Sequence, residues 1–211
     1  MTWGSTPTAV PWDQGITWRT EEVSVVTGFL SLGVAFVGDK ILRVRSDDAE
    51  EDLIVSYIKA AEGLYEHETG DSLAPKRLAM HLSGAPTGGY IELQSPPVRG
   101  VVSISYYDGD GVSQEYDGSP SEWSLVTGGR YSVPVVQLGV NQQWPTSLAT
   151  RADAITVTYD VGYLTPSEIP AMVKTGLGLV VAELYKNGDL TNADGQMPNL
   201  LHLERFWKKR Y

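Results

Sequence analysis

The stretch from Asp47 to Thr69 constrains the fold more than any other part of the sequence, because its apolar residues recur at the spacing of one helix face. Asp47 and Glu50 stand at capping-box spacing, and Gly70 suits the left-handed stop after a helix. The pattern predicts a long amphipathic helix whose apolar face is buried. That face comprises Leu53, Ile54, Tyr57, Ile58, Ala61, Leu64 and Tyr65.

A second helix is predicted over residues 170–187. Pro170 suits the first turn, because its missing N–H would have no partner there. Gly176 and Gly178 each cost about 1 kcal/mol of helix stability relative to Ala, but they permit close packing. A short last helix is predicted over 199–208. The apolar stripe of the second helix comprises Val173, Leu177, Val180, Val181 and Leu184.

Between Lys76 and Tyr163 the apolar period changes to two, which is typical of strands. The sequence Asp108-Gly109-Asp110-Gly111 predicts a hairpin, because these residues tolerate positive φ. We expect a meander-like antiparallel sheet. The fold class is therefore α+β: a small helical bundle with an antiparallel β-sheet domain inserted between the first long helix and the second. The predicted strands are 77–83, 90–93, 101–107, 114–116, 131–137 and 154–159.

These patterns predict three parts: an N-terminal arm or extension over 1–40, a helical core formed by 41–75 and 164–211, and a β-rich insertion over 76–163. The segment from Val23 to Val44 fits either one or two strands or a helix broken by glycines. The arm is either a frayed terminus or an inter-subunit arm, since large aromatic residues are favoured interface anchors. Its candidate anchors are Trp3, Trp12 and Trp18.

Composition narrows the function classes. With 211 residues and 42% hydrophobic content, the chain can build a well-packed core. It has no cysteine, which fits synthesis in a reducing compartment. The net charge of −10 argues against a protein that grips phosphate backbones. The uncharged run 23–38 is shorter than the roughly 20 residues that cross a bilayer, so no membrane association is expected.

Catalytic and metal-binding patterns are weak. His67, His81 and His202 lie in different predicted elements, and none has the spacing of a metal or triad motif. Asp108 with Asp110, and the segment 189–195, resemble calcium loops only faintly, and turn chemistry explains them without an ion. We therefore expect no catalytic residue, no cofactor and no metal site.

The β-rich region leaves one alternative of another class open. Trp123, Trp144 and the acidic residues of this region are the groups that a carbohydrate-binding or glycoside-hydrolysing domain uses. Their linear spacing singles out no carboxylate pair.

Several motifs, taken together and in order, resemble the head–tail connector (adaptor) family of tailed bacteriophages. They are Ile41-Leu42-Arg43-Val44 before the first long helix, Ser95-Pro96-Pro97-Val98, the segment from Tyr106 to Gly111, Trp144-Pro145, the segment from Ala152 to Tyr159 with Gly162-Tyr163, Ile169-Pro170, Leu184-Tyr185-Lys186-Asn187, and Leu200-Leu201 through Arg205. The resemblance covers roughly residues 41–207, and residues 1–40 depart from it.

The resemblance implies a structural virion protein at the head–tail interface. It implies a homo-oligomeric ring, with twelve subunits in the particle, that binds the portal protein and downstream stopper or tail proteins. DNA would pass through the ring without sequence-specific binding, and an acidic lumen would let it slide. Another ring component of the same particle, a stopper or tail-end protein, is the alternative role.

The end of the chain is the candidate contact with the portal or a neighbouring subunit. Basic residues alternate there with aromatic ones, a composition that suits an interface, although a solvated tail is the other interpretation. The candidate residues are Leu200, Leu201, Arg205, Phe206, Trp207, Lys208, Arg210 and Tyr211. The stripes of the two long helices are assigned mainly to the core, which leaves their flanking residues for contacts between subunits.

Overall fold

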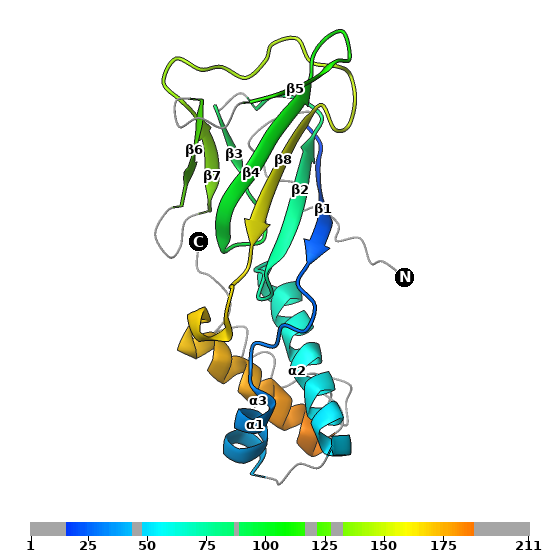
Figure 1. Cartoon of the computed structure of the whole chain (residues 1–211), viewed down its shortest axis with the longest axis vertical. Helices are drawn as coiled ribbons and strands as arrows, with labels where there is room; N and C mark the ends of the chain where they lie inside the picture. The colour runs from blue at the N-terminus through cyan, green and yellow to red at the C-terminus, as the bar shows by residue number, and fades with distance from the viewer. Residues whose placement is uncertain (1–15, 44–47, 87–88, 117–121, 128–132, 188–211) are drawn as a thin grey trace. The chain divides into compact units, whose positions relative to one another are not determined.

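The computed structural model describes residues 16–43, 48–86, 89–116, 122–127 and 133–187 (Figure 1). The chain forms two compact units: a sheet unit within residues 1–25 and 76–161, and a helical unit within residues 26–75 and 162–211. The described part of the predicted N-terminal arm is shared between them, because residues 18–25 form a strand of the sheet unit and residues 26–42 belong to the helical unit.

The helical unit is built on the two helices that periodicity predicted. α2 spans Asp48–Thr69 and α3 spans Ala171–Asn187. Gly70 has φ +70° and its N–H donates to the Glu66 carbonyl at 3.0 Å, which ends α2 as expected. Three short elements complete the unit: α1 (Val34–Phe36), the π-helix η1 (Val37–Leu42) and the 3₁₀ helix η2 (Pro166–Glu168).

Both helical stripes supply the core of this unit, except that Leu53, expected on the buried face of α2, is 43% exposed. Buried side chains of α2 and α3 form one cluster with residues of the loop and short helices before α2. At the far end of the pair, the Tyr185 hydroxyl donates to Glu50 Oε1 at 2.5 Å, and this bond raises the pKa of Tyr185. The cluster comprises Phe29, Leu32, Val37, Ile54, Ile58, Ala61, Tyr65, Leu73, Ile169, Leu177, Val180, Val181 and Leu184.

The sheet unit contains eight strands in the described ranges, and all of the strand pairs are antiparallel. A five-stranded sheet has the order β1-β2-β8-β4-β5, and a three-stranded sheet has the order β3-β7-β6. The strands are β1 (Trp18–Val25), β2 (Lys76–Leu82), β3 (Tyr90–Glu92), β4 (Val98–Tyr107), β5 (Ser113–Glu115), β6 (Trp123–Val126), β7 (Val135–Leu138) and β8 (Ile155–Val161).

The α+β class is confirmed and each predicted strand has a counterpart, although the one predicted over 131–137 begins at Val135 and residues 131–132 lie outside the described ranges. The meander is wrong and the inserted sheet needs correction. β8 lies between β2 and β4, so the central strands pair across most of the insertion. β1 precedes α2 and forms the edge of the large sheet, so the sheet is not wholly inserted. The other strands lie between α2 and α3, which are the second and third α-helices because α1 precedes them.

The predicted hairpin at Asp108 joins β4 to β5. The Gly111 N–H donates to the Asp108 carbonyl at 2.9 Å, and Gly111 has φ +79°. Asp108 Oδ1 accepts the N–H groups of Asp110 and Val112, and Oδ2 accepts from the Gln114 amide. These hydrogen bonds, led by that of Gln114, lower the pKa of Asp108. The carboxylate therefore organises the turn, as the turn interpretation of this motif expected.

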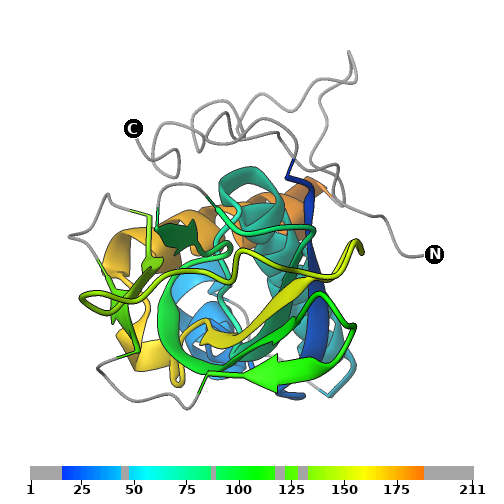
Figure 2. The same ribbon diagram turned by 90° about the horizontal axis from the view of Figure 1, so that it is seen from above.

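The two sheets share one core, and Figure 2 shows the large sheet curving beside the small one. Alternate residues of β2, β4 and β8 face that core, together with residues of β3 and β7. The inward-facing residues of β8 are fully buried, while Thr156, Thr158 and Asp160 alternate with them. The shared core includes Leu78, Met80, Leu82, Ile91, Leu93, Ile104, Val136, Leu138, Ile155, Val157 and Tyr159.

Candidate functional site

Most of the site residues expected from the sequence lie outside the described residues. The eight C-terminal candidates, Leu200, Leu201, Arg205, Phe206, Trp207, Lys208, Arg210 and Tyr211, are among them, as are Trp3 and Trp12. Trp18 is described: it is the first residue of β1, pairs with Leu82, and packs half-buried against the core of the sheet unit. Its part in a contact between subunits stays a prediction.

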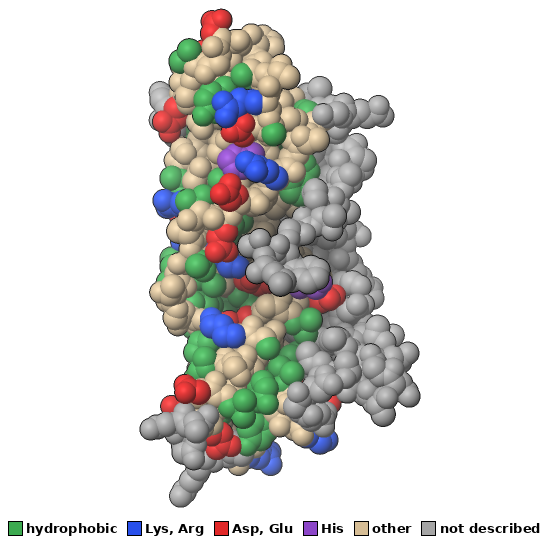
Figure 3. Space-filling view, turned by 90° about the vertical axis from the view of Figure 1, so that its right-hand side faces the viewer, with side chains coloured by type: hydrophobic (Ala, Val, Ile, Leu, Met, Phe, Trp, Pro, Cys, Tyr) green, Lys and Arg blue, Asp and Glu red, His purple; other side chains and the backbone are tan. Residues whose placement is uncertain are grey.

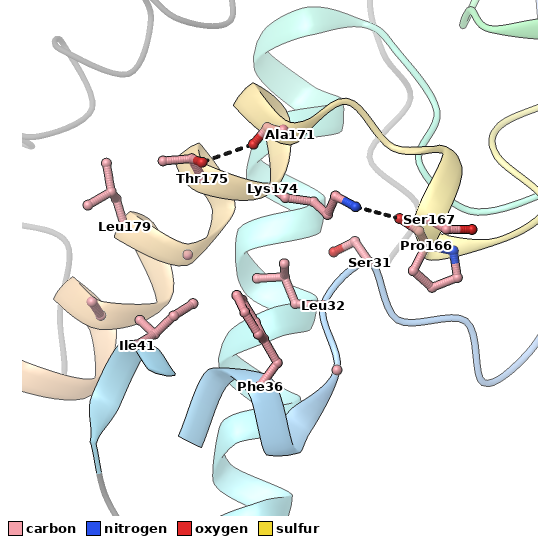
Figure 4. Close-up of a pocket in the computed structure, with 13 residues that line it drawn as sticks. Ser31, Leu32, Phe36, Ile41, Pro166, Ser167, Ala171, Lys174, Thr175 and Leu179 are labelled. Carbon is pink, nitrogen blue, oxygen red and sulfur yellow. Dashed lines mark hydrogen bonds between the residues drawn. The ribbon is translucent and has the colours of Figure 1, made fainter. Parts of the chain in front are cut away.

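The described part of the helical unit has an apolar groove beside α3, with a volume of about 690 Å³. One side is formed by the loop before α1, by α1 and by η1, and the other by η2 and α3 (Figure 4). We call it the α3 groove. It is lined by Ser31, Leu32, Gly33, Phe36, Ile41, Pro166, Ser167, Ala171, Lys174, Thr175, Gly178, Leu179 and Ala182.

A glycine lets the two sides of the groove approach each other. A Cβ on Gly178 of α3 would lie 2.7 Å from Ile41 Cδ1, which is closer than real Cβ contacts. Ile41 belongs to η1, a π-helix, and such rare wide turns are frequent at functional sites. η1 is followed by Arg43, whose φ of +59° turns the chain out of the helix. The close packing that Gly178 suggested in the sequence is therefore present.

A buried carboxylate holds the loop that forms one wall of the α3 groove. Glu62 of α2 is 7% exposed, and its Oε1 accepts the N–H of Ser31 at 2.5 Å. Lys59 donates to Glu62 Oε2 at 3.1 Å and to the carbonyl of Phe29. A buried charge needs such partners, because leaving it unpaired costs several kcal/mol. The ion pair therefore fixes the loop 29–31 against α2.

The groove lining is almost free of charge. Lys174 is its one charged residue, and the Lys174 ammonium donates to the carbonyl of Pro166 at 3.1 Å (Figure 4). Phe36 is 54% exposed and Leu179 is 55% exposed, which is high for large apolar side chains at the edge of a pocket. The lining thus offers apolar contact area and, among its residues, a single cation.

Sequence reasoning missed these residues because it assigned apolar positions to the core. Leu179 lies outside the stripe of α3, and Met172, which is 53% exposed, also lies outside it. Apolar residues on a second face of a helix were the available signal. In Figure 3 hydrophobic side chains gather over part of the helical unit with acidic and basic side chains around them, and charged and histidine side chains are interspersed over the sheet unit.

A second pocket, of about 580 Å³, lies in the sheet unit and is lined in part by Gln142, Gln143 and Trp144. Its described lining residues include no Asp or Glu, so it lacks the carboxylate pair that glycoside hydrolysis uses. Trp123 and Trp144 keep their indole N–H groups buried without a partner among the described residues. This pocket offers an aromatic and amide surface rather than an acid–base pair.

The histidines form no shared site in the described part of the chain. His67 is exposed in the last turn of α2, and His81 Nδ1 lies 3.0 Å from Thr156 Oγ1 in the sheet unit. His202 lies outside the described residues. The residues described contain no group of three or more His, Asp or Glu side chains arranged for a metal ion. In the same ranges, none of the helices combines the length and the hydropathy of a membrane-spanning segment.

Solved structures of gene transfer agent (GTA) particles contain chains with the same fold. One, from the virion of a native GTA particle, has a TM-score of 0.66 and 22% identity over 91% of this chain and 96% of that chain. A chain from the neck of an empty GTA particle, computed with C6 symmetry, has a TM-score of 0.66 and 24% identity over 92% and 96%.

A third match is a chain from the neck of a native GTA particle computed with C12 symmetry, with a TM-score of 0.64 and 22% identity over 92% of this chain and 96% of that chain. No protein-family model and no curated protein matches the sequence. At these identities the comparisons show a common fold over nearly the whole of both chains, and function has to be argued from the residues.

Proposed function

We propose that this protein is a head–tail adaptor: a structural subunit of a ring that lies under the portal of a phage or phage-like particle and extends the DNA channel toward the tail. The observation that supports this most strongly is the shared fold with chains of GTA virions and necks over more than nine-tenths of either chain. The motifs that resemble connector proteins run in order through the same region, roughly residues 41–207.

The α3 groove is the surface that suits ring assembly. A ring forms when one face of each subunit meets a different face of the next, so each subunit needs a receiving surface and a projecting one. The exposed side chains of Phe36 and Leu179 beside an almost uncharged groove provide the receiving surface. We propose twelve subunits for this ring, because one of the similar chains comes from a particle neck that was computed with C12 symmetry.

The charge of the chain suits passage of DNA. The net charge is −10, with 16 basic against 26 acidic residues. A channel wall rich in Lys and Arg would retain DNA through its phosphates, whereas an acidic wall lets it slide. We propose that DNA passes without sequence-specific binding, and that the protein, made in the host cytoplasm, ends at the head–tail interface of the virion.

The C-terminal candidates are assigned to the portal. The segment that contains Leu200, Leu201, Arg205, Phe206, Trp207, Lys208, Arg210 and Tyr211 combines apolar, aromatic and basic side chains, which interfaces favour. On its other side the ring would meet stopper or tail proteins. A stopper or tail-end ring of the same particle is the alternative role. Two of the similar chains are described only as coming from a neck, which does not distinguish an adaptor from a stopper.

Direct binding to the portal distinguishes these roles. Purified protein mixed with the portal ring of the same particle should co-sediment with it, and a reconstruction of the complex should show twelve copies. A variant ending at Arg205 should lose this binding and keep its circular dichroism spectrum. Val140→Ser, at a side chain that is 90% exposed, is the control that should bind normally. A chain that ignores the portal but binds the assembled neck would be a stopper or tail-end protein instead.

A further inference from the structure

We infer that the α3 groove of each subunit receives the N-terminal segment, residues 1–15, of a second copy of this chain. The inference rests on the proposed ring, and it assigns to that ring its receiving surface and its projecting segment. Residues 1–15 carry Trp3 and Trp12, and they precede the first described residue, Ile16.

Charge favours this occupant. Residues 1–15 include one charged side chain, Asp13, and the lining of the groove includes one, Lys174, of the opposite sign. The other terminal segment fits less well, because residues 199–211 carry Arg205, Lys208, Lys209 and Arg210 and a single acidic residue, Glu204. Placing those cations in the groove would bury charge beside a lining that offers no carboxylate.

Size and composition agree with the charge. A cavity of about 690 Å³ lies within the range of about 300–1,000 Å³ in which proteins bury drug-sized ligands. Tryptophan is enriched among interface anchors, where its apolar ring is buried and little conformational entropy is lost. The exposed phenyl ring of Phe36 and the exposed side chain of Leu179 provide the apolar area that an indole would cover.

The geometry of the sheet unit favours a second copy over the chain's own groove. Thr17 and Ser83 exchange hydrogen bonds of 2.9 and 3.0 Å, which hold the start of β1 at one end of the sheet. The chain connections to the helical unit leave from the other end, because Val25 pairs with Lys76 and Lys76 pairs with Val161. These ends are separated by a seven-residue strand, β2, and at about 3.3 Å per residue that is roughly 20 Å.

A segment of 15 residues reaches about 50 Å when extended. The segment begins at the sheet end opposite the connections, so about 20 Å of this reach would be spent along its own sheet, a cost that a second copy does not impose. Exchange of one such segment per subunit around a ring makes every contact identical, as a heterologous interface requires.

The chain has no cysteine, so single introduced cysteines report the contact without background. The arm variant is Val10→Cys and the groove variant is Leu179→Cys. The matched control is Leu53→Cys, a leucine of the same unit that is 43% exposed and lies outside the groove lining. Under mild oxidation, a mixture of the arm and groove variants should form at least about tenfold more mixed disulfide dimer than the arm and control variants, because docking raises the effective concentration.

Two further variants decide between the alternatives. The double variant Val10→Cys/Leu179→Cys should form a ladder of crosslinked chains, whereas an internal disulfide in the monomer would overturn docking to a second copy. Replacing Trp3 and Trp12 by Ala in the arm variant should reduce the dimer about tenfold, because the indole anchors supply the affinity. Equal crosslinking at positions 179 and 53, or undiminished dimer without the two tryptophans, would also overturn the inference.

The outcome separates this inference from the proposed function. If rings that bind the portal form without crosslinks between positions 10 and 179, the arm docks elsewhere and the adaptor role stands. If the crosslinked ladder forms but the protein neither closes into rings nor binds the portal, the docking stands and the adaptor role is wrong.

Discussion

The two units of this chain differ in the apolar residues that they expose to solvent. Among the described residues of the sheet unit, the exposed large apolar ones are Val23, Val25, Tyr90, Val102, Val112, Val126 and Val140, six of them valines. β-branched residues are common on strands whichever way they face. In the helical unit the exposed large apolar residues include Val26 and five larger ones, Phe36, Leu53, Leu164, Met172 and Leu179, of which Phe36 and Leu179 line the α3 groove. The surface of the helical unit is therefore better suited to contact with another protein than that of the sheet unit.

The units also differ in how they satisfy polar groups. On the sheet, charged side chains pair near the surface, as Arg77 does with Asp160 at 2.8 Å. In the helical unit Glu62 is buried and serves the backbone of the groove wall. A buried carboxylate that holds a loop is expensive to disrupt, whereas a surface pair is worth little. The difference predicts that polar mutations matter more in the helical unit.

The largest effect should come from matched cavities in the two cores. Ile58 of α2 and Ile155 of β8 are both 0% exposed, and replacing either by Ala should cost about 2–5 kcal/mol of unfolding free energy. Because each residue packs in a separate core, hydrogen exchange should quicken mainly in the unit that carries the change. Mass spectrometry of exchanged peptides measures this. Equal loss of protection in both units would mean that they unfold as one.

Next in size is Gly162→Ala in the helical unit. A Cβ at Gly162 would lie 2.0 Å from the Ala74 carbonyl oxygen, and the residue has φ +81°. Backbone strain and overpacking together should cost about 3 kcal/mol. Urea unfolding measures the loss. The control is Gly63→Ala in α2, where a Cβ meets nothing within 4 Å, and which should stabilise by about 0.5–1 kcal/mol. An unchanged free energy of unfolding for Gly162→Ala would show that the backbone around this turn shifts to accommodate the added Cβ.

Sequence alone predicted the two long helices well and the sheet topology poorly, while the helix predicted over 199–208 lies outside the described residues. α2 and α3 follow from local periodicity, because each buries one stripe. β1 was not predicted, because its residues are exposed on both faces and no alternation marks it as a strand. The placement of β8 between β2 and β4 depends on pairing between residues such as Leu78 and Tyr159, far apart in the chain, for which local pattern gives no signal.

The candidate site was harder still to predict. Phe36 and Leu179 are apolar residues in helical segments, and pattern arguments place such residues in the core. Leu179 lies outside the predicted stripe that contains Leu177 and Val180, and its exposure confirms that it lies on another face of α3. The two glycines of α3 were the better signal, since Gly178 does mark the close approach of Ile41. Sequence motifs identify catalytic and metal-binding residues, whereas this groove is defined by the shape of its apolar lining.

A smaller effect is expected for Glu62→Ala. The change leaves the buried N–H of Ser31 without its acceptor and removes a partner of Lys59, so it should cost about 1–3 kcal/mol. Amide exchange at Ser31 and Leu32 should rise more than exchange elsewhere in the unit, because the groove wall is released. Glu68→Ala, at an exposed position near the end of the same helix, is the control. Equal exchange in both variants would show that Glu62 does not hold the loop.

The smallest effect belongs to the surface pair of the sheet. Arg77 donates to both carboxylate oxygens of Asp160, and these hydrogen bonds lower the pKa of that carboxyl. A pKa that is lower in the folded chain than in the unfolded one gives stability that is fully present above the ordinary Asp value of about 3.9, and that is lost as pH falls through the folded value. The side chains are 42% and 26% exposed, so the pair is screened by solvent.

Asp160→Asn should therefore lower stability by about 0.2–1 kcal/mol at neutral pH. Urea midpoints measured at several pH values should show the gap to the wild type closing as pH falls below about 4. In an Arg77→Met background the same substitution should cost less and show a weaker pH dependence, since the donor that lowers the pKa is gone. A cost as large as that of Glu62→Ala would break the comparison, because the sheet unit would then rely on its polar pairs as much as the helical unit does.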